Sequence, residues 1–344
     1  RMVPFGGWDM PVQYTGILDE TRAVRNSVGV FDVSHMGRVV IKGAGAGEFL
    51  SRIFSTDVGK LVVGRAKYGV TCDQEGGIID DNIVYRLSPM EYMFIPNAGN
   101  REVIALWLNR WLPSDGSVVI DDLSERTAMI AVQGPDSLRT LSVLAGSDLE
   151  SVSPFRIVEM AICGQLMLVA RTGYTGEDGV EVILPAEDAT WLWQSLQQRK
   201  VVVCGLGARD VLRLEAGLLL HGVDMDTEVN PIEAGLERFV KFDKGDFCGG
   251  KAVIEARSTG TQFRLTAFRM QDRRSPRHDY AILAQGQPIG HITSGSYSPT
   301  LDRAIGLGYV PMQYTIPGTQ LEIDLRGKIA KAEVVRLPFY SRSR

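Results

Sequence analysis

Two adjacent carboxylates, Asp80 and Asp81, are the residues whose type and position stand out first. They interrupt an apolar run that resumes at Ile83. Asp is depleted in strands, and neighbouring side chains of a strand point to opposite faces, so one of the two faces whatever the sheet covers. Acids that break a local rule in this way occur mainly at functional sites. A charge at a strand edge facing water fits the same pattern, and both readings stay open at this point.

Three further side chains could recognise a polar ring. Asn97 follows a strand and can donate and accept at once, which suits the edge of a heterocycle, although turn chemistry is the commoner role. Glu181, on a strand after a glycine-rich loop, could accept two N–H groups or form a salt bridge. Arg209 near a helix start is disfavoured by the helix dipole, which predicts an anionic or planar partner, whereas Asp210 is explained as a capping residue.

Ser34 and His35 stand side by side, but this does not predict a hydrolase. Nucleophile–base pairs are built by convergence in space, and sequence neighbours rarely form them. We therefore expect His35 to be a hydrogen-bonded, partly buried structural residue.

The elements that must position these residues can be read from periodicity and turn signals. Residues 68–86 read as two strands joined by a glycine turn at 73–77, and residues 92–96 as a further strand. Strands and helices then alternate in a mixed order that suggests a split βαβ arrangement. Residues 1–16 look irregular, 211–220 helical and 231–236 a short helix.

From residue 262 the pattern changes to short strands separated by turns, which predicts an all-β barrel or sandwich. We place a domain boundary near residue 258, so that residues 259–344 form the all-β domain. The basic stretch 269–278 reads as a solvated face that could meet an acidic partner, not as a nucleic-acid site.

Composition excludes several classes. The chain has 344 residues, 44% hydrophobic and 23% charged, and its net charge of −4 gives no bulk attraction to nucleic acid or an anionic membrane surface. No apolar run reaches the about 18 residues of a transmembrane helix. The four Cys are far apart, which predicts reduced, buried thiols and neither a disulfide framework nor a metal site. The chain opens at Arg1 without a recognisable leader, which leaves N-terminal targeting open.

Taken together, the motifs resemble those of the aminomethyltransferase (T-protein) family of the glycine cleavage system, within the folate-binding T-protein superfamily. In chain order they are G-W-D-M-P-V-Q-Y, F-D-V-S-H-M, G-G-I-I-D-D, N-A-G-N, A-V-Q-G-P, R-T-G-Y-T-G-E-D-G-V-E, G-L-G-A-R-D-V-L-R-L-E-A-G and I-T-S-G-S-Y-S-P-T-L. The resemblance covers essentially the whole chain.

The resemblance implies an α+β fold of three domains in a cloverleaf around a central folate site. The expected domains are a discontinuous α/β domain, a ferredoxin-like domain and a C-terminal β-barrel or jelly roll. The resemblance thus implies that residues 1–258 hold two interleaved α+β domains and residues 259–344 the barrel domain. It also implies a reaction. An aminomethyl group on the lipoyl arm of the H-protein loses ammonia, and its carbon is captured by tetrahydrofolate, the cosubstrate, as 5,10-methylenetetrahydrofolate. The expected location is the cytoplasm, or the mitochondrial matrix in a eukaryote.

Site residues follow from the same resemblance, position by position. Asp81 matches the catalytic aspartate near folate N10, where a carboxylate can orient the nitrogen and stabilise a cationic carbon, with Asp80 on the other face of the strand. Glu181 matches the pterin-binding glutamate and Arg209 a folate-contacting arginine. The remaining positions that match the pocket lining are Tyr68, Met36, Ile83, Ile95, Asn97 and Tyr174. The match at Pro338, Phe339 and Tyr340 places that segment near the folate tail.

Two positions depart from the family pattern, and other functions compete. Asn82 stands where the family usually has an aliphatic residue, and His221 where a Tyr is common. Because relatives on this fold demethylate sulfur or oxygen, a tetrahydrofolate-dependent S- or O-demethylase is the alternative. A non-enzymatic folate-binding protein of iron–sulfur assembly is disfavoured, because the loop R-T-G-Y-T-G-E-D-G lacks the Cys of those relatives.

Overall fold

The paired acids lie in a hairpin, as predicted. In the computed structural model, which describes residues 1–342, β5 (Ala66–Cys72) pairs with β6 (Ile78–Ser88) through a turn closed by Gly76 at φ +89°. These strands open a five-stranded antiparallel sheet of order β5-β6-β7-β4-β8. Its other strands are β7 (Glu91–Ile95), β4 (Val39–Lys42) and β8 (Val119–Asp122). Helices α2 (Ala46–Ile53) and α3 (Arg101–Trp111) bury Phe49, Leu50 and Ile104 in the core against this sheet.

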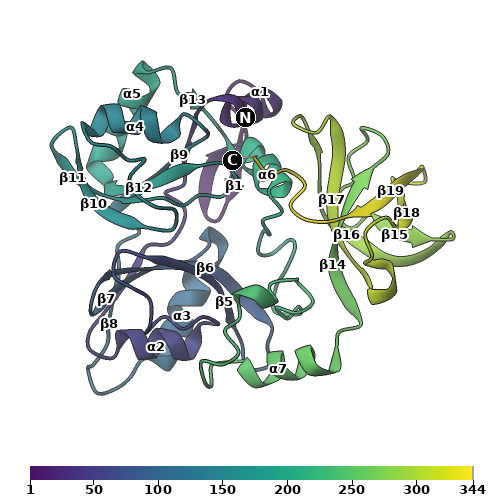
Figure 1. Ribbon diagram of the computed structural model, residues 1–344, viewed down its shortest axis with the longest axis horizontal. Helices are drawn as coiled ribbons and strands as arrows, with labels where there is room; N and C mark the ends of the chain where they lie inside the picture. Colours follow the sequence, from purple (N-terminus) through teal and green to yellow (C-terminus); the bar gives the residue numbers. More distant parts are fainter. Residues whose placement is uncertain (343–344) are drawn as a thin grey trace.

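The second sheet has six strands in the order β10-β11-β12-β9-β3-β13. Its strands are β3 (Gly29–Asp32), β9 (Thr127–Gln133), β10 (Ile157–Ile162), β11 (Gln165–Ala170), β12 (Gly179–Pro185) and β13 (Val202–Val203). Helices α4 (Ser137–Ala145) and α5 (Ala189–Gln198) bury Leu141 and Leu192 against it. Since β3 precedes the five-stranded sheet in the chain and β9 follows it, the two α+β units are interleaved, as expected (Figure 1).

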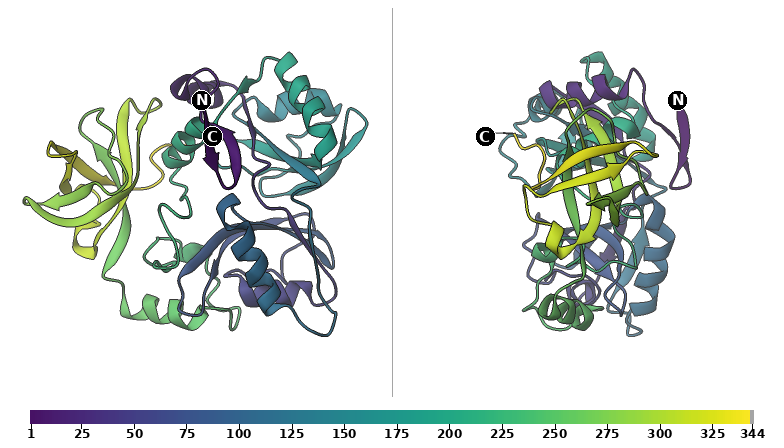
Figure 2. Two further views of the ribbon diagram at one scale, coloured as in Figure 1. Left: turned by 180° about the vertical axis from the view of Figure 1, so that it is seen from behind. Right: turned by 90° about the vertical axis from the view of Figure 1, so that its right-hand side faces the viewer.

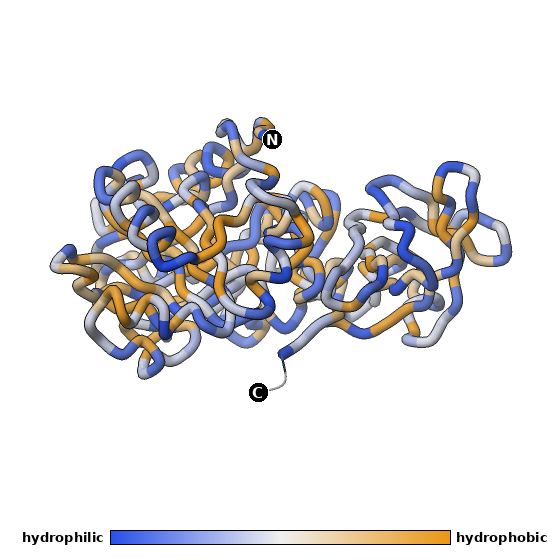
Figure 3. Tube along the Cα trace, turned by 90° about the horizontal axis from the view of Figure 1, so that it is seen from above, coloured by the Kyte–Doolittle hydropathy of each residue, from blue (hydrophilic) through white to orange (hydrophobic). Residues whose placement is uncertain are grey.

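The C-terminal part is a closed six-stranded barrel, β14-β17-β16-β15-β18-β19. Its strands are β14 (Phe263–Met270), β15 (Ala281–Ala284), β16 (Gln287–Ser298), β17 (Arg303–Pro311), β18 (Gln320–Asp324) and β19 (Ile329–Val335). Helix α7 (Gly250–Thr259) leads into it, so the predicted boundary at 258 falls at the end of this helix. The barrel and the two sheets form three lobes around a common centre (Figures 1 and 2). Along the chain, hydrophobic and hydrophilic segments alternate, and many of the outermost turns are hydrophilic (Figure 3).

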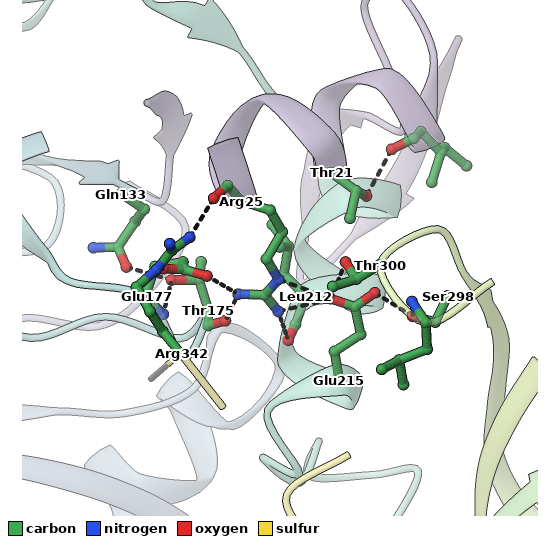
Figure 4. A network of polar contacts seen from close by, with 12 residues as sticks. Thr21, Arg25, Gln133, Thr175, Glu177, Leu212, Glu215, Ser298, Thr300 and Arg342 are labelled. Atoms are coloured by element: carbon green, nitrogen blue, oxygen red, sulfur yellow. Dashed lines mark hydrogen bonds and ion pairs between the residues drawn. The ribbon is translucent and has the colours of Figure 1, made fainter. Parts of the chain in front are cut away.

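A buried ion-pair network joins the lobes. Arg25, at the end of α1 (Ile17–Asn26), donates to Glu177 at 2.9 Å and to Glu215 at 2.8 Å, and both carboxylates are fully buried. Glu215 ends α6 (Leu206–Glu215) and accepts from Ser298 of the barrel at 2.5 Å. The C-terminal segment closes the network, because Arg342 donates to Glu177 (Figure 4). One cluster thus ties the first helix, the central helix, the barrel and the chain end.

Several local expectations were wrong. Residues 1–16 contain a hairpin of β1 (Met2–Phe5) and β2 (Trp8–Pro11), because Gly6 and Gly7 at φ +56° and +82° make its turn. Helix α6 begins at Leu206, capped by Gly205, and ends before Gly217 at φ +68°, so Asp210 is no cap and instead pairs with Arg213 at 2.7 Å. Residues 231–235 form turns where a helix was expected, followed by the 3₁₀ turn Glu237–Phe239.

The structure also corrects the expectations for the cysteines and for the basic stretch 269–278. Cys72 and Cys204 are buried as predicted, but Cys163 is exposed and Cys248 half-buried. The basic stretch is neutralised locally, because Arg273 pairs with Asp302 at 2.5 Å and Arg274 with Asp272 at 2.6 Å. It therefore offers less free positive charge to an acidic partner than its composition suggests. Within residues 1–342, no helix is long and apolar enough to cross a membrane.

Candidate active site

Asp81 sits part-buried on β6 and is held from two sides. The hydroxyl of Tyr68, on β5, donates to Asp81 Oδ2 at 3.0 Å, and the side-chain amide of Asn97, just after β7, donates to Oδ1 at 2.8 Å. Tyr68 is itself supported by the edge of Phe239, whose ring centroid lies 4.6 Å from its own. Three neighbouring strands thus fix one carboxylate by short hydrogen bonds.

The environment of Asp81 makes it easier to protonate than an ordinary aspartate. Burial and the negative charge of Asp80 raise the pKa of Asp81 to about 7, while the hydrogen bonds from Tyr68 and Asn97 act in the opposite direction. A carboxyl with a pKa near neutrality can exchange protons with a bound ligand at physiological pH.

Asp80 contradicts the expectation of an edge charge facing water, but it lies on the other face of β6 from Asp81, as expected, because it is paired with Thr71 whereas Asp81 is paired with Val70. It is fully buried, and the Asn97 amide that reaches Asp81 also lies 2.8 Å from Asp80 Oδ1. A β-bulge directly precedes the two acids: Cys72 pairs with Ile78 but Thr71 with Asp80, which leaves Ile79 without a partner. Bulges redirect side chains and occur often next to active sites.

One face of β6 connects Asp81 to Glu181. Asp81, Ile83 and Tyr85 alternate along the strand and so share a face, over about 13 Å at the usual rise per residue. At its far end the Tyr85 hydroxyl lies 2.8 Å from Thr172 Oγ1 and 3.5 Å from Glu181 Oε2. Asp81 thus lies at one end of this face of β6, and Glu181 of β12 contacts the other end through Tyr85.

Glu181 is held by a single oxygen. Its Oε2 accepts from Thr172 at 2.5 Å, whereas no hydrogen bond within residues 1–342 reaches Oε1. Burial raises the pKa of Glu181, and the hydrogen bond from Thr172 and the charge of Arg209 counteract this. This leaves one oxygen able to accept an N–H group from a ligand.

Arg209 finds the planar partner that its position predicted. The guanidinium carbon of Arg209 lies 4.8 Å from the ring centroid of Tyr174, and Tyr174 donates its hydroxyl to the Leu219 carbonyl. The Arg209 side chain makes no hydrogen bond within the described residues, and burial lowers its pKa. Its five N–H donors remain available to an acceptor on a ligand.

The apolar positions line the same region. Ile83 of β6 faces Ile95 of β7 in the register, and both belong, with Met36, to the cluster packed between the two sheets. Met36 follows β3 and is half-buried. The structure thus brings Met36, Ile83 and Ile95 into one wall beneath the polar groups.

Four residues of this region escaped the sequence reasoning. Tyr85 and Thr172 hold Glu181, and Asn100 donates to Asp80 at 2.8 Å. Thr71 donates to Asn82 at 2.8 Å. Thr172 and Asn100 fall within quoted motifs, whereas Tyr85 and Thr71 carried no signal in the sequence, because tyrosines and threonines on strands are ordinary. The segment 338–340 contacts the ion-pair network: Tyr340 lies under Arg25, 4.2 Å from ring centroid to guanidinium carbon.

Ser34 and His35 form no catalytic pair. Ser34 Oγ accepts from the Met129 amide at 3.1 Å, which is a structural role. His35 is buried, as expected, but its Nδ1 has no hydrogen-bond partner among the described residues, so the expected hydrogen-bonded histidine is wrong at that atom. Burial and the charges of Arg209 and Arg38 lower the pKa of His35 to about 3.

Comparison with known proteins identifies the class. Residues 1–244 match the model of the GCVT N-terminal domain and residues 264–341 that of the glycine cleavage T-protein C-terminal barrel domain. The chain therefore belongs to the glycine cleavage T-protein family.

Individual relatives are similar to this chain over nearly its full length. The chain is 41% identical to the aminomethyltransferase of Geobacillus kaustophilus over 350 residues, covering 100% of this chain and 96% of the relative. It is 42% identical to that of Thermosynechococcus vestitus over 344 residues, covering 100% and 93%. The crystal structure of the glycine cleavage system aminomethyltransferase T from Bartonella henselae matches with a TM-score of 0.93 at 34% identity, covering 99% of this chain and 94% of that one. The three-domain fold expected from the sequence is thereby confirmed.

The donor set of the site favours an organic ligand. Among residues 1–342, no group of three or more His, Cys, Asp or Glu side chains could hold a metal ion. Instead the site offers the Asp81 carboxyl, whose pKa is about 7, and two groups without a hydrogen bond among the described residues, Glu181 Oε1 and the Arg209 guanidinium. An apolar wall lies beside them. Such a surface can bind a flat heterocycle by its polar edge.

Proposed function

We propose that this chain is the tetrahydrofolate-dependent aminomethyltransferase of the glycine cleavage system. Its substrates are the aminomethyl-dihydrolipoyl arm of the H-protein and tetrahydrofolate, and its products are ammonia, the dihydrolipoyl arm and 5,10-methylenetetrahydrofolate. The observation that carries the proposal is the full-length similarity to aminomethyltransferases, together with a carboxyl at Asp81 that titrates near neutrality.

The reaction makes two bonds and breaks two. The carbon leaves its sulfur and its amine and becomes bonded to N5 and N10 of the folate. The protons displaced from these two nitrogens end on the sulfur and on the departing ammonia. A carboxylate beside N10 stabilises the cationic carbon as it is attacked and can take up a proton, and we assign this role to Asp81.

The binding roles follow from the free acceptors and donors. Glu181, through Oε1, is proposed to accept N–H groups of the pterin, and Arg209 to contact an acceptor of the folate. Tyr68 and Asn97 orient Asp81, as their hydrogen bonds at 3.0 and 2.8 Å support. Met36, Ile83, Ile95 and Tyr174 are proposed to enclose the ring. The segment 338–340 stays a proposal for the folate tail.

The substrate assignment is tested with one assay panel. Purified protein receives tetrahydrofolate and aminomethylated H-protein in one arm, and tetrahydrofolate with a methylsulfonium or methoxy donor in the others. We expect methylenetetrahydrofolate and ammonia only in the first arm. Methyl transfer from the sulfonium or methoxy donor, with no reaction of the H-protein, would establish the demethylase instead. The comparisons favour the aminomethyltransferase, because the full-length relatives carry that name.

We propose a cytoplasmic location, because the relatives named above come from bacteria. In a eukaryotic source the mitochondrial matrix would replace it. The division into an interleaved region, 1–258, and a barrel domain, 259–344, is likewise proposed.

A further inference from the structure

Asp80 is a buried carboxylate without a cationic partner. It is fully buried, and none of the salt bridges among residues 1–342 includes it. It instead accepts four N–H groups, all of them from asparagines. Oδ2 accepts from Asn82 Nδ2 at 2.6 Å and from the Asn97 backbone at 3.0 Å, and Oδ1 from the side chains of Asn97 and Asn100, each at 2.8 Å.

Such a set of donors stabilises the ionised form without neutralising it. Each N–H group satisfies one lone pair of the carboxylate, and hydrogen bonds to a charged acceptor are about twice as strong as neutral ones. A buried charge with fewer donors would be protonated or expelled. Asp80 is thus a buried carboxyl group whose two oxygens are both engaged by N–H donors.

Asn97 transmits this arrangement to Asp81. Its amide nitrogen lies 2.8 Å from Asp80 Oδ1, 2.8 Å from Asp81 Oδ1 and 2.9 Å from the Asp81 carbonyl. Because Asp80 also binds the Asn97 backbone N–H, both the main chain and the side chain of Asn97 are pinned. The direction of the donor that meets Asp81 therefore depends on Asp80.

The network ends at the two positions that depart from the family pattern. Asn82 lies on one side of Asp80, and His221 on the other, where its Nδ1 accepts from Asn100 at 2.8 Å. Its Nε2 then carries the hydrogen and donates to the Ile78 carbonyl at 3.0 Å. Both unusual residues thus support the same carboxylate.

We propose that Asp80 is a positioning residue for Asp81: through Asn97 it fixes the direction of the Asp81 carboxylate and sets its ionisation. This inference rests on the catalytic role proposed for Asp81. Asp80 does not touch the reacting atoms itself.

The charged and titratable groups around Asp81 come from several elements. Asp80 lies on the same strand as Asp81, Tyr68 lies on β5, and Tyr174 lies on the loop before β12. The charges of Arg209 and Arg213 act on the Tyr174 hydroxyl. Of the charged groups, Asp80 acts most strongly on Asp81 and raises its pKa. Removing the charge of Asp80 must therefore make Asp81 ionise at lower pH.

The first test follows the ionisation of Asp81 directly. Protein labelled with ¹³C at the Asp carboxyls is titrated by NMR, and comparison with Asp81→Asn identifies the Asp81 signal. We expect the Asp81 midpoint to fall in Asp80→Asn and to stay near its original value in Asp80→Glu, which keeps the charge. The matched control is Asp73→Asn, which removes an acid from the turn of the same hairpin, where the Asp73 side chain accepts from the Gly77 backbone at 2.8 Å. An unmoved midpoint in folded Asp80→Asn would overturn the proposal.

The second test does not require Asp80→Asn to fold. Asn100→Ala removes a donor from Asp80, and Asn100 has no hydrogen bond to Asp81. We expect it to lower turnover about tenfold or more, because small displacements of catalytic groups are costly. In the Asp81→Asn background the same change should add nothing, since a residue acting through Asp81 has no effect once Asp81 is neutralised. Additive losses would overturn the proposal and mark the network as merely structural.

The two proposals fail in different ways. If the unmodified enzyme transfers no aminomethyl carbon, the proposed function is wrong, but the NMR titration still decides whether Asp80 governs Asp81. If turnover is normal and the midpoint does not respond to Asp80, only this inference is wrong.

Discussion

The Tyr68 hydroxyl donates to Asp81 Oδ2 at 3.0 Å across the β5–β6 pair. Both side chains lie within one hairpin, so the contact is local to the β5–β6 pair. Because the hydrogen bond stabilises the ionised carboxylate, it lowers the pKa of Asp81 against the raising effects of burial and Asp80.

Tyr68→Phe should therefore raise the pKa of Asp81 above about 7 and shift the acid limb of the turnover profile to higher pH. At pH 7 we expect turnover to fall by roughly 3- to 30-fold, the size of one hydrogen bond to a charged group. The check is kcat measured from pH 5.5 to 9. A uniform loss at all pH values would contradict the electrostatic role.

Asp81→Asn should lower kcat by about 10²- to 10³-fold, while the Kd for tetrahydrofolate changes less than about threefold. The reason is that the charge is needed when the carbon becomes cationic, not when the folate binds. Single-turnover kinetics and titration of the intrinsic Trp fluorescence measure the two quantities. Equal losses in both would assign Asp81 to binding or folding.

Glu181→Gln should weaken tetrahydrofolate binding by about 10- to 100-fold, because Glu181 is proposed to accept N–H groups of the ring through a charge. The control is Glu187→Gln, an exposed acid just beyond the end of the same strand. Fluorescence titration reads both variants. Unchanged affinity in Glu181→Gln would remove it from the binding site.

His35 should make the fold acid-sensitive. Its pKa in the folded state is about 3, below the ordinary value of 6.5, so the unfolded chain binds one more proton between these values. The stability contribution is therefore complete above pH 6.5 and is lost as the pH falls toward 3. Between pH 7 and 5 this amounts to about 2 kcal/mol. In urea denaturation, His35→Leu should lose less stability over that interval than the unmodified protein, and an equal loss would argue against this assignment.

Arg25→Met should destabilise the protein by about 3–5 kcal/mol, because it leaves the buried carboxylates of Glu177 and Glu215 without their central cation. Arg342→Met is the matched comparison: this arginine also pairs with Glu177 but is 41% exposed, so its loss should cost about 1 kcal/mol or less. Urea denaturation measures both. Similar losses would show that burial does not govern this network.

The sequence alone was enough to predict much of this protein. The hairpin around Asp80 and Asp81 and the change to short strands near residue 262 follow from local periodicity and turn residues. The interleaved α+β region was expected from the resemblance of the motifs to a known family. The motif order was enough to name the family, which the full-length relatives confirm. Local chemistry also predicted an anionic or planar partner for Arg209, although not that a planar partner would be Tyr174.

Only the tertiary structure decided how the acids are used. The bulge at Ile79 is a matter of strand register, which depends on pairing between segments and not on local pattern. Asp80 and Asp81 meet at Asn97 because β7 ends beside β6, and Arg25 meets Glu177 and Glu215 across 152 and 190 residues of chain. Burial, which sets the pKa of Asp81, arises from these distant contacts, so the sequence could indicate an acid of interest but not its ionisation.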